Sequence, residues 1–372
     1  MKKKCQSLLV IIIGLVMFSQ TAYAHYDEAY SHAPGAVAEN AAWMAQLDGS
    51  MRLSEISIPG THDTMSVKGG DISQNQTMTL TEQLHSGIRV FDMRTRHIND
   101  SFAMHHGIIF QGTWFDNDVL VPINNFLDAY PGETVIMHLQ SADTAVNNTR
   151  SYAETLQAYL DVYGAKYWAP TSNNPTLDEI RGKFVILQNF SGGDFGIPSG
   201  SLDAQGFLRS EWALTTNWNL YDKWTKVKAH IEKADNGSRD NVYFNFLSAS
   251  TGSLPYFVAS GHSSNGTSAA RLATGLTTPG WAGSYPDFPR LNCFIGICTI
   301  AFEGTNILAA DYIANSGIGF AGMVVADFPG KRLINNIINL NFPEKNCKTV
   351  YYEEVVGCDT ITVSEEVCDD NI

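Results

Sequence analysis

Histidines, aspartates and an arginine recur where strand-like apolar segments of this sequence end. Four such segments, residues 53–58, 88–93, 101–105 and 319–325, end at or shortly before these polar side chains: His62, Asp63, Asp92, Arg94, His105, His106 and Asp327. The carboxyl ends of parallel strands face one side of a sheet or barrel, so we expect these side chains to meet. One histidine alone is usually structural, and an aspartate after a strand often caps a helix. Their recurrence on four segments predicts one shared site.

This set of residue types suits proton transfer at a phosphoryl group. Two histidines can act as general base and general acid on opposite sides of a reacting centre near neutral pH. An arginine between them offers a fixed charge and a planar fork for phosphoryl oxygens. Aspartates beside the imidazoles set their tautomer. We therefore predict in-line displacement at phosphorus by a hydroxyl group, without a metal ion.

The elements that must position these residues alternate along the chain. Further strand-like segments occupy residues 134–139, 184–188 and 242–247, and amphipathic helix-length segments occupy 119–130, 151–163, 218–234 and 305–314. Alternating strands and helices predict a parallel sheet with helical crossovers. No Pro/Ser linker, repeat or charge block divides residues 25–345. We expect one α/β domain, residues 25–346, with a closed barrel as the leading geometry.

The first 24 residues have the pattern of a secretory signal peptide. Lys2, Lys3 and Lys4 precede an apolar run over residues 8–18, and Ala22-Tyr23-Ala24 is a small-x-small cleavage site. The run is too short for a transmembrane helix. We expect cleavage near Ala24 and a secreted protein, periplasmic or extracellular, that is soluble and monomeric.

Charge and cysteine content narrow the class of protein and its compartment further. The formal net charge is −14, which argues against a nucleic-acid partner because phosphate binding needs clustered Lys and Arg. Outside the signal segment the cysteines are confined to the last quarter, which suggests structural disulfides in an oxidising compartment. The short-loop pairs Cys293–Cys298 and Cys347–Cys358 are the expected ones. Residues 347–372 are acidic and form a predicted disulfide-held tail.

The sequence from about residue 53 to 139 resembles the X domain of phosphatidylinositol-specific phospholipases C, above all the bacterial members. Residues 57–63 (SIPGTHD) are similar to the family's opening I-P-G-[ST]-H-[DN] motif, and residues 83–94 (QLHSGIRVFDMR) to its Q-L-x-x-G-I-R-x-x-D-x-R block. Residues 105–107 match its second histidine motif, and 126–136 its F-L-x-x-[NH]-P-x-E-x-[IV] segment. Weaker similarity continues to Asp327. The resemblance implies a distorted TIM (β/α)8-type barrel.

The resemblance also implies roles for the polar residues. His62 would deprotonate the inositol 2-hydroxyl, Arg94 would stabilise the charge that develops at phosphorus, and His106 would protonate the departing diacylglycerol oxygen. The product would be an inositol 1,2-cyclic phosphate, which water opens more slowly. His106 rather than His105 is taken as the acid because it directly precedes the glycine.

The aspartates are expected to support these groups, and no cofactor is expected. By the same match Asp327 pairs with His62, while Asp63 and Asp92 orient His106 and Arg94. Eukaryotic members place acidic calcium ligands near the position of Arg94, and calcium needs several oxygen ligands. A guanidinium there repels a cation, so independence from metal ions is expected.

Head-group recognition departs from the bacterial pattern. The positions corresponding to the family's ring-binding Lys, Arg and Asp are Gln140, Asn189 and Asn217, and all three are uncharged. Plain phosphatidylinositol, a glycosylated form and another polyol phosphodiester stay open as substrates. Trp218 is either the ring-stacking aromatic or a core residue.

The expected partner is a phospholipid at a membrane surface, reached transiently. The aromatic pairs at residues 114–115 and 256–257 either insert into that surface or pack against helices. Two other functions stay open: a metal-dependent barrel of the glycerophosphodiesterase or sphingomyelinase D type, and a barrel that binds inositol lipid or glycan without turnover.

Overall fold

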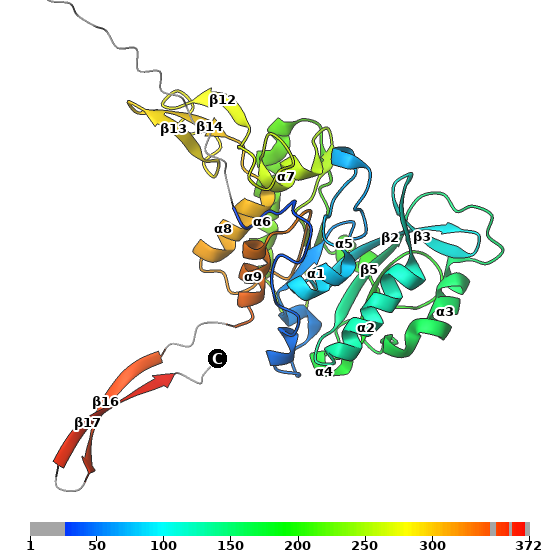
Figure 1. Ribbon diagram of the computed structural model, residues 1–372, viewed down its shortest axis with the longest axis horizontal. Helices are drawn as coiled ribbons and strands as arrows, with labels where there is room; N and C mark the ends of the chain where they lie inside the picture. Colours follow the sequence, from blue (N-terminus) through cyan, green and yellow to red (C-terminus); the bar gives the residue numbers. More distant parts are fainter. Residues whose placement is uncertain (1–26, 343–346, 357–358, 369–372) are drawn as a thin grey trace, which may run out of the picture.

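The structure is a computed structural model that describes residues 27–342, 347–356 and 359–368 (Figure 1). Its main element is a ten-stranded sheet in which eight parallel strands follow the order β7-β6-β5-β2-β1-β15-β10-β8. These strands are β1 (Ile58–Thr61), β2 (Val90–Ile98), β5 (Val135–Ser141), β6 (Phe184–Asn189), β7 (Ile197–Pro198), β8 (Leu208–Arg209), β10 (Phe244–Phe246) and β15 (Met323–Ala326).

The predicted distorted α/β barrel is confirmed, but the barrel is open. Strands β7 and β8 stand at the two ends of the strand order and do not pair with each other in the described part of the chain. Each has two residues, and the chain between them forms helix α5 (Ser199–Ala204). The sequence around β7, SGGDFGIPSG, is rich in Gly and Pro, which weaken strands. A closed ring of long strands is therefore not supported on this side.

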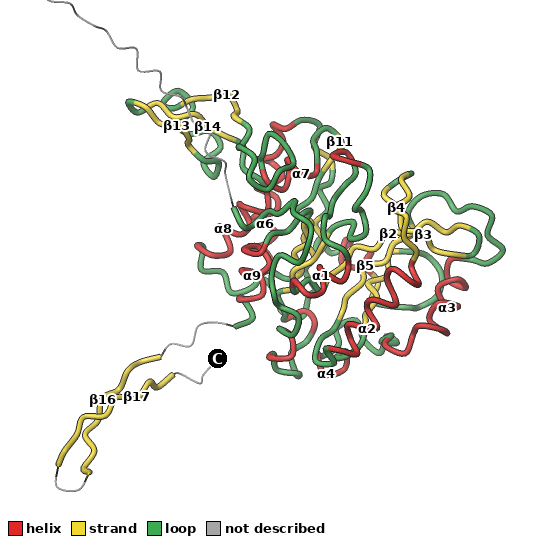
Figure 2. Tube along the Cα trace, in the orientation of Figure 1, coloured by secondary structure: helices red, strands yellow, loops and turns green. Residues whose placement is uncertain are grey.

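Helices cover the sheet on both flanks, with α2 and α3 on one and α6, α8 and α9 on the other (Figure 2). The helices predicted at residues 119–130, 151–163, 218–234 and 305–314 correspond to α2, α3, α6 and α8. The remaining α-helices are short or follow the last strand. The bounds are α1 (Leu80–Ser86), α2 (Val121–Ala129), α3 (Tyr152–Tyr163), α4 (Leu177–Ile180), α6 (Leu220–Asn236), α7 (Pro255–Ser260), α8 (Thr305–Asn315) and α9 (Lys331–Asn339).

Helix boundaries follow local capping chemistry. Thr79 with Glu82, and Ser151 with Glu154, form capping boxes that start α1 and α3. Gly87 ends α1 with a left-handed backbone. Short 3-10 or π turns connect other elements, and they are η1 (Met44–Gln46), η2 (Leu53–Glu55), η3 (Gly70–Ile72), η4 (Phe115–Leu120), η5 (Gly164–Lys166) and η6 (Asn217–Asn219). The first predicted strand was placed too early, because residues 53–55 form η2 and the strand begins at Ile58.

The segment predicted as a third parallel strand runs antiparallel. Strand β3 (Ser101–His106) pairs with β2 and with β4 (Ile109–Trp114) in an antiparallel ribbon. The β2–β3 turn consists of Asn99 and Asp100, both with positive φ, which is the backbone of a two-residue hairpin. Because β2 continues beyond the sheet and β3 returns, His106 still arrives at the carboxyl end of the parallel strands.

A three-stranded antiparallel sheet is inserted between β10 and β15. It contains β12 (Ala273–Thr277), β13 (Arg290–Phe294) and β14 (Ile297–Ala301) and extends from the rest of the fold in Figure 1. The predicted disulfide Cys293–Cys298 joins β13 to β14. A further pair of short parallel strands is formed by β9 (Ala213–Leu214) and β11 (Ser250–Thr251).

The tail forms a hairpin of β16 (Cys347–Val356) and β17 (Asp359–Cys368). Its register places Cys347 opposite Cys368, whereas the predicted partner Cys358 lies outside the described residues. The predicted signal peptide also lies outside them. In the part of the chain that is described, no helix is long and apolar enough to span a membrane.

Candidate active site

The predicted polar residues converge at the carboxyl ends of β1, β2 and β15. His62 follows β1, and its Nδ1 lies 2.7 Å from Oδ1 of the buried Asp327, which follows β15. Its Nε2 lies 2.6 Å from Nη2 of Arg94 on β2. A guanidinium can only donate, so Nε2 is the acceptor and the proton is on Nδ1, directed at Asp327. In this tautomer Nε2 carries a lone pair, which accepts from Arg94 here and can accept a proton once Arg94 moves away.

Asp327 is held by an amide that sequence reasoning missed. Asn75 donates from Nδ2 to Oδ1 of Asp327 at 2.9 Å and lies in the loop after η3. Asn306 on α8 donates to the Asp327 main-chain carbonyl at 2.8 Å. The carboxylate thus has a fixed orientation before any substrate arrives. Nothing in the spacing of residue 75 indicates this contact, because a long-range loop–strand approach creates it.

Arg94 lies between two buried carboxylates. Its Nη2 and Nε are 3.0 and 3.1 Å from Oδ2 of Asp92, and its Nη1 is 3.4 Å from Oδ2 of Asp63. Burial alone would raise the pKa of Asp92, but Arg94 and His138 outweigh it and hold that pKa well below its ordinary value. Burial dominates at Asp63 and raises its pKa, despite Arg94. Arg94 is thereby positioned by opposite charge and hydrogen bonds rather than by packing.

His106 lies within ion-pair distance of the expected Asp63, but its nearest partners are two serines. Its Nδ1 lies 2.6 Å from the main-chain oxygen of Ser73 and 3.3 Å from Oγ of Ser66, whereas Oδ2 of Asp63 is 3.7 Å away. A carbonyl oxygen can only accept, so Ser73 fixes the proton on Nδ1 and leaves Nε2 to exchange protons. The neighbouring His105 is buried and packs against Phe110, as a structural residue does.

His138 is a second residue that the sequence analysis missed. It lies on β5 opposite Asp92 in the parallel register, and its Nδ1 is 2.9 Å from Oδ1 of Asp92. Gln140 occupies the next inward position, opposite Arg94, and donates from Nε2 to the same Asp92 oxygen at 2.7 Å. Alternation along a strand puts residues two apart on one face. The polar pair at 138 and 140 within an apolar strand was the signal available.

A polar cavity of about 440 Å³ opens beside Arg94. Gln140 and Asn189 line it as expected, but Asn217 does not, since its Oδ1 accepts a hydrogen bond from Ser253 at 2.8 Å elsewhere. The cavity is not uncharged. Its further polar and aromatic walls are Asp203, Arg209, Glu211 and Trp212.

Trp218 is not in that cavity. Its ring packs edge-on against Phe302 and also approaches Tyr285, so the interpretation as a packing residue is the one that the structure supports. Phe246 on β10 and Trp212 after β8 both line the cavity; Phe246 is buried, whereas Trp212 is 63% exposed.

An apolar cavity of about 470 Å³ lies on the other side of the site, against His106. Its wall includes Ile72, Ile108 and Leu254, and the first two are almost fully exposed. The expected inserting aromatics are mostly unsuitable, because Phe115 and residues 256–257 are buried and only residue 114 is partly exposed. Those rings pack into the protein interior.

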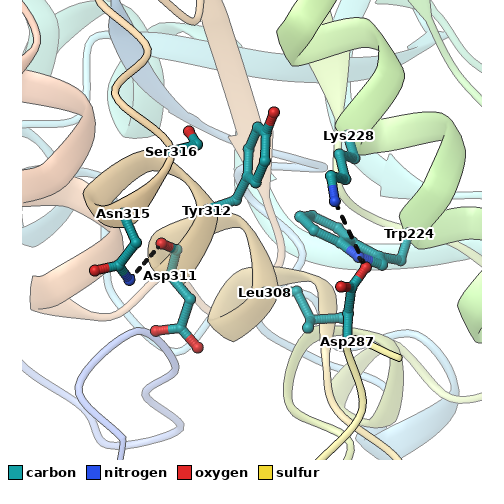
Figure 3. Close-up of a pocket in the computed structure, with 8 residues that line it drawn as sticks. All are labelled: Trp224, Lys228, Asp287, Leu308, Asp311, Tyr312, Asn315 and Ser316. Carbon is teal, nitrogen blue, oxygen red and sulfur yellow. Dashed lines mark hydrogen bonds and ion pairs between the residues drawn. The ribbon is translucent and has the colours of Figure 1, made fainter. Parts of the chain in front are cut away.

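A third cavity, of about 380 Å³, is remote from these residues (Figure 3). It lies between α6 and α8, where Lys228 Nζ is 3.8 Å from Asp287 and lies over the ring of Tyr312. Trp224 also donates to Asp287 there at 2.7 Å, and none of the predicted site residues lines the cavity. Among the described residues, no group of three or more His, Cys, Asp or Glu side chains could hold a metal ion.

Fold and site together define an α/β-barrel phosphodiesterase class, and the comparisons give the family. The family model described as phosphatidylinositol-specific phospholipase C, X domain, matches residues 50–190. The 1-phosphatidylinositol phosphodiesterase of Staphylococcus aureus is 31% identical over 287 residues, covering 68% of this chain and 83% of the relative. The Listeria monocytogenes enzyme of the same name is 33% identical over 224 residues, covering 56% and 68%.

Solved structures agree on the fold. The Listeria monocytogenes phosphatidylinositol-specific phospholipase C superposes with a TM-score of 0.57 at 24% identity, covering 81% of this chain and 98% of that one. A Staphylococcus aureus enzyme structure gives a TM-score of 0.55 at 23% identity, covering 82% and 98%. The chain therefore belongs to the bacterial phosphatidylinositol-specific phospholipase C family.

Proposed function

We propose that this protein cleaves phosphatidylinositol into diacylglycerol and a cyclic inositol phosphate, with His62 as general base, His106 as general acid and Arg94 as the charge-stabilising group. Membership of the family supports the reaction class. The observation that carries the assignment is the chain of contacts from Asp327 through His62 to Arg94, with His106 held separately by Ser73.

The reaction runs as an in-line displacement. His62 Nε2 takes the proton of the inositol 2-hydroxyl while that oxygen forms a bond to phosphorus. Arg94 leaves His62 and donates to the phosphoryl oxygens, where a charge-assisted fork is strongest. The bond from phosphorus to the glycerol oxygen breaks, and His106 Nε2 supplies the proton that this oxygen needs. Water attack on the cyclic product uses the two histidines in reversed roles.

The two cavities that flank the site support a phospholipid substrate. The polar cavity beside Arg94, with Gln140 and Asn189, suits a polyol head group. The apolar cavity beside His106 suits the glycerol and acyl side, which is the side of the leaving oxygen. A polar ligand alone would gain nothing from the exposed Ile72 and Ile108.

The placement of Arg94 supports the proposal that the reaction needs no metal ion. Its guanidinium lies within 3.4 Å of both Asp63 and Asp92 and neutralises the carboxylates that a divalent cation would need. We further propose that the chain acts after export as a monomer that visits the membrane surface. The disulfide Cys293–Cys298 supports an oxidising compartment.

Phosphorus NMR on phosphatidylinositol micelles with excess chelator tests this proposal. We expect a cyclic phosphodiester signal from the wild type and a rate about 10²–10⁴-fold lower from His62→Ala, since that is the usual contribution of a positioned base. His85→Ala is the matched control, because His85 is an exposed histidine on α1, and it should react like the wild type. Turnover by His62→Ala at the wild-type rate, or loss of wild-type turnover in chelator, contradicts the proposal.

A further inference from the structure

The end of the β13–β14 hairpin carries the most exposed apolar group of the inserted sheet. Phe294 is 73%, Ile295 84% and Ile297 53% exposed, and Trp281 in the preceding loop of the same sheet is also exposed. The three residues at the hairpin end, with Gly296, are called the hairpin tip below. Exposed large apolar side chains in a contiguous group mark an interaction site.

The backbone of the hairpin tip is strained. Phe294 pairs with Ile297 across the hairpin, so Ile295 and Gly296 form a two-residue turn, and both have positive φ, 47° and 76°. Asn-Gly is the favoured pair for such a turn, whereas a β-branched residue in the left-handed region is strained. An exposed isoleucine here gains nothing from the fold.

The hairpin tip has no charged residue near it in the sequence. No Asp, Glu, Lys or Arg occurs from residue 291 to 302, in a chain of net charge −14. The disulfide Cys293–Cys298 closes the hairpin directly behind the tip. A small, uncharged and cross-linked apolar projection has the chemistry of an element that enters the interfacial region of a lipid bilayer.

The base of the inserted sheet contacts the region around the site. Asn265, in the loop leading to the inserted sheet, donates to Asp71 in η3, and η3 supplies Ile72 to the cavity against His106. Phe302, just after β14, contacts Trp218, whose neighbour Asn217 is bonded to Ser253 of the same cavity wall. The exposed apolar wall of the site and the base of the inserted sheet are therefore connected through direct contacts.

We propose that the hairpin tip inserts into the outer layer of a phospholipid bilayer and holds the enzyme on the surface that contains its substrate. This rests on the proposed function only in that the substrate is a membrane lipid. The tip contributes affinity for the surface, and the cavity beside His106 then receives one lipid molecule.

The test is sedimentation with phosphatidylcholine vesicles that contain no phosphatidylinositol, so binding is measured without turnover. The key variant is Ile295→Asn, because it creates the favoured Asn-Gly turn and removes an apolar side chain without endangering the fold. We expect its vesicle affinity to fall about tenfold, and that of Phe294→Ser/Ile295→Asn about 100-fold, from the apolar area lost. Val162→Asn on α3, equally exposed at 71%, should bind like the wild type.

Turnover separates this proposal from the proposed function. The tip variants should lose activity on vesicles while keeping wild-type activity on monomeric short-chain phosphatidylinositol. If the double variant binds vesicles as the wild type does, the docking role is wrong. It is also wrong if the wild type self-associates in the absence of vesicles and the same substitutions abolish that self-association. Absence of turnover on every phosphatidylinositol substrate, with tip-dependent vesicle binding intact, overturns the proposed function and not the docking role.

Discussion

The two halves of the sheet differ in the length of their parallel strands and in what they contribute to the site. The first, β1 to β6, lies within the region that the family model matches and has parallel strands of four to nine residues. The second, β7 to β15, has parallel strands of two to four residues and contains the inserted sheet. The first half supplies His62, Arg94 and His106, and the second supplies Asp327, most of the polar cavity's wall and the hairpin tip. Under the proposed function, both histidines and the arginine thus come from the first half, and most of the wall of the proposed head-group cavity comes from the second.

One buried ion pair in each half illustrates the difference. In the first half, Glu133 accepts hydrogen bonds from Arg89 and from the main-chain amides of residues 44 and 45. In the second, Glu303 accepts from Arg271 through Oε2 alone, and its buried Oε1 has no hydrogen-bond partner among the described residues. A buried charge that is incompletely paired is expensive. The Arg89–Glu133 pair is therefore the more completely hydrogen-bonded of the two, and the Arg271–Glu303 pair leaves one buried carboxylate oxygen without a partner among the described residues.

The largest expected effect on turnover in this comparison comes from replacing Arg94, which joins His62, Asp92 and Asp63 in the first half. Arg94→Lys keeps the charge but removes the fork that reaches His62, Asp92 and Asp63. We expect turnover to fall about 10²–10³-fold, as for other groups that stabilise transition-state charge, with the melting temperature nearly unchanged. Arg96→Lys is the control, since Arg96 is a partly exposed arginine on the same strand. A loss of less than about tenfold for Arg94→Lys means that a point charge suffices and that the fork has no role.

A smaller effect, on the pH dependence of stability, is expected from the Arg271–Glu303 pair of the second half. Burial raises the pKa of Glu303 from 4.5 to about 7, although Arg271 opposes the shift. A folded-state pKa above the unfolded one means that the contribution to stability is complete below pH 4.5 and is lost as pH rises through about 7. Wild-type stability should therefore fall over this window, by at most roughly 3 kcal/mol.

Glu303→Gln tests this, because the variant lacks the titrating group. Its unfolding free energy, measured by urea titration between pH 4.5 and 8, should improve relative to the wild type as pH rises. Glu39→Gln, at an exposed glutamate, should follow the wild type at every pH. If the difference between Glu303→Gln and the wild type does not change with pH, the contrast between the two buried pairs is wrong.

In both halves the sequence predicted long elements better than short ones, for a physical reason. Long strands and amphipathic helices leave periodic patterns over many residues, so α2, α3, α6, α8 and the strands β2, β5 and β6 were predicted nearly in place. Two-residue strands such as β7 and β8 leave no period, and their pairing depends on distant partners. The direction of β3 was wrong although Asn99-Asp100 is a hairpin signal.

The same contrast applies to the site. The convergence of His62, Arg94, His106 and Asp327 followed from strand ends, which the topology brings together. Ser73 and Asn75 were missed because they act from a loop that folds over the site. The wall of the polar cavity beside Arg94 was predicted only in part. The residues around β8 join that wall because β8 pairs with β10, which lies more than 30 residues later in the sequence.

The smallest expected effect distinguishes Trp212 from Trp218, both of which are exposed tryptophans of the second half. Trp212 lines the polar cavity, while Trp218 packs against Phe302. We expect Trp212→Ala to raise KM for monomeric short-chain phosphatidylinositol about tenfold with kcat little changed, because a ring platform binds ground state and transition state alike. Trp218→Ala should leave KM unchanged. If instead Trp218→Ala raises KM and Trp212→Ala does not, the head group contacts η6 rather than the segment after β8. Substrate selection then belongs to the segment that contains Asn217.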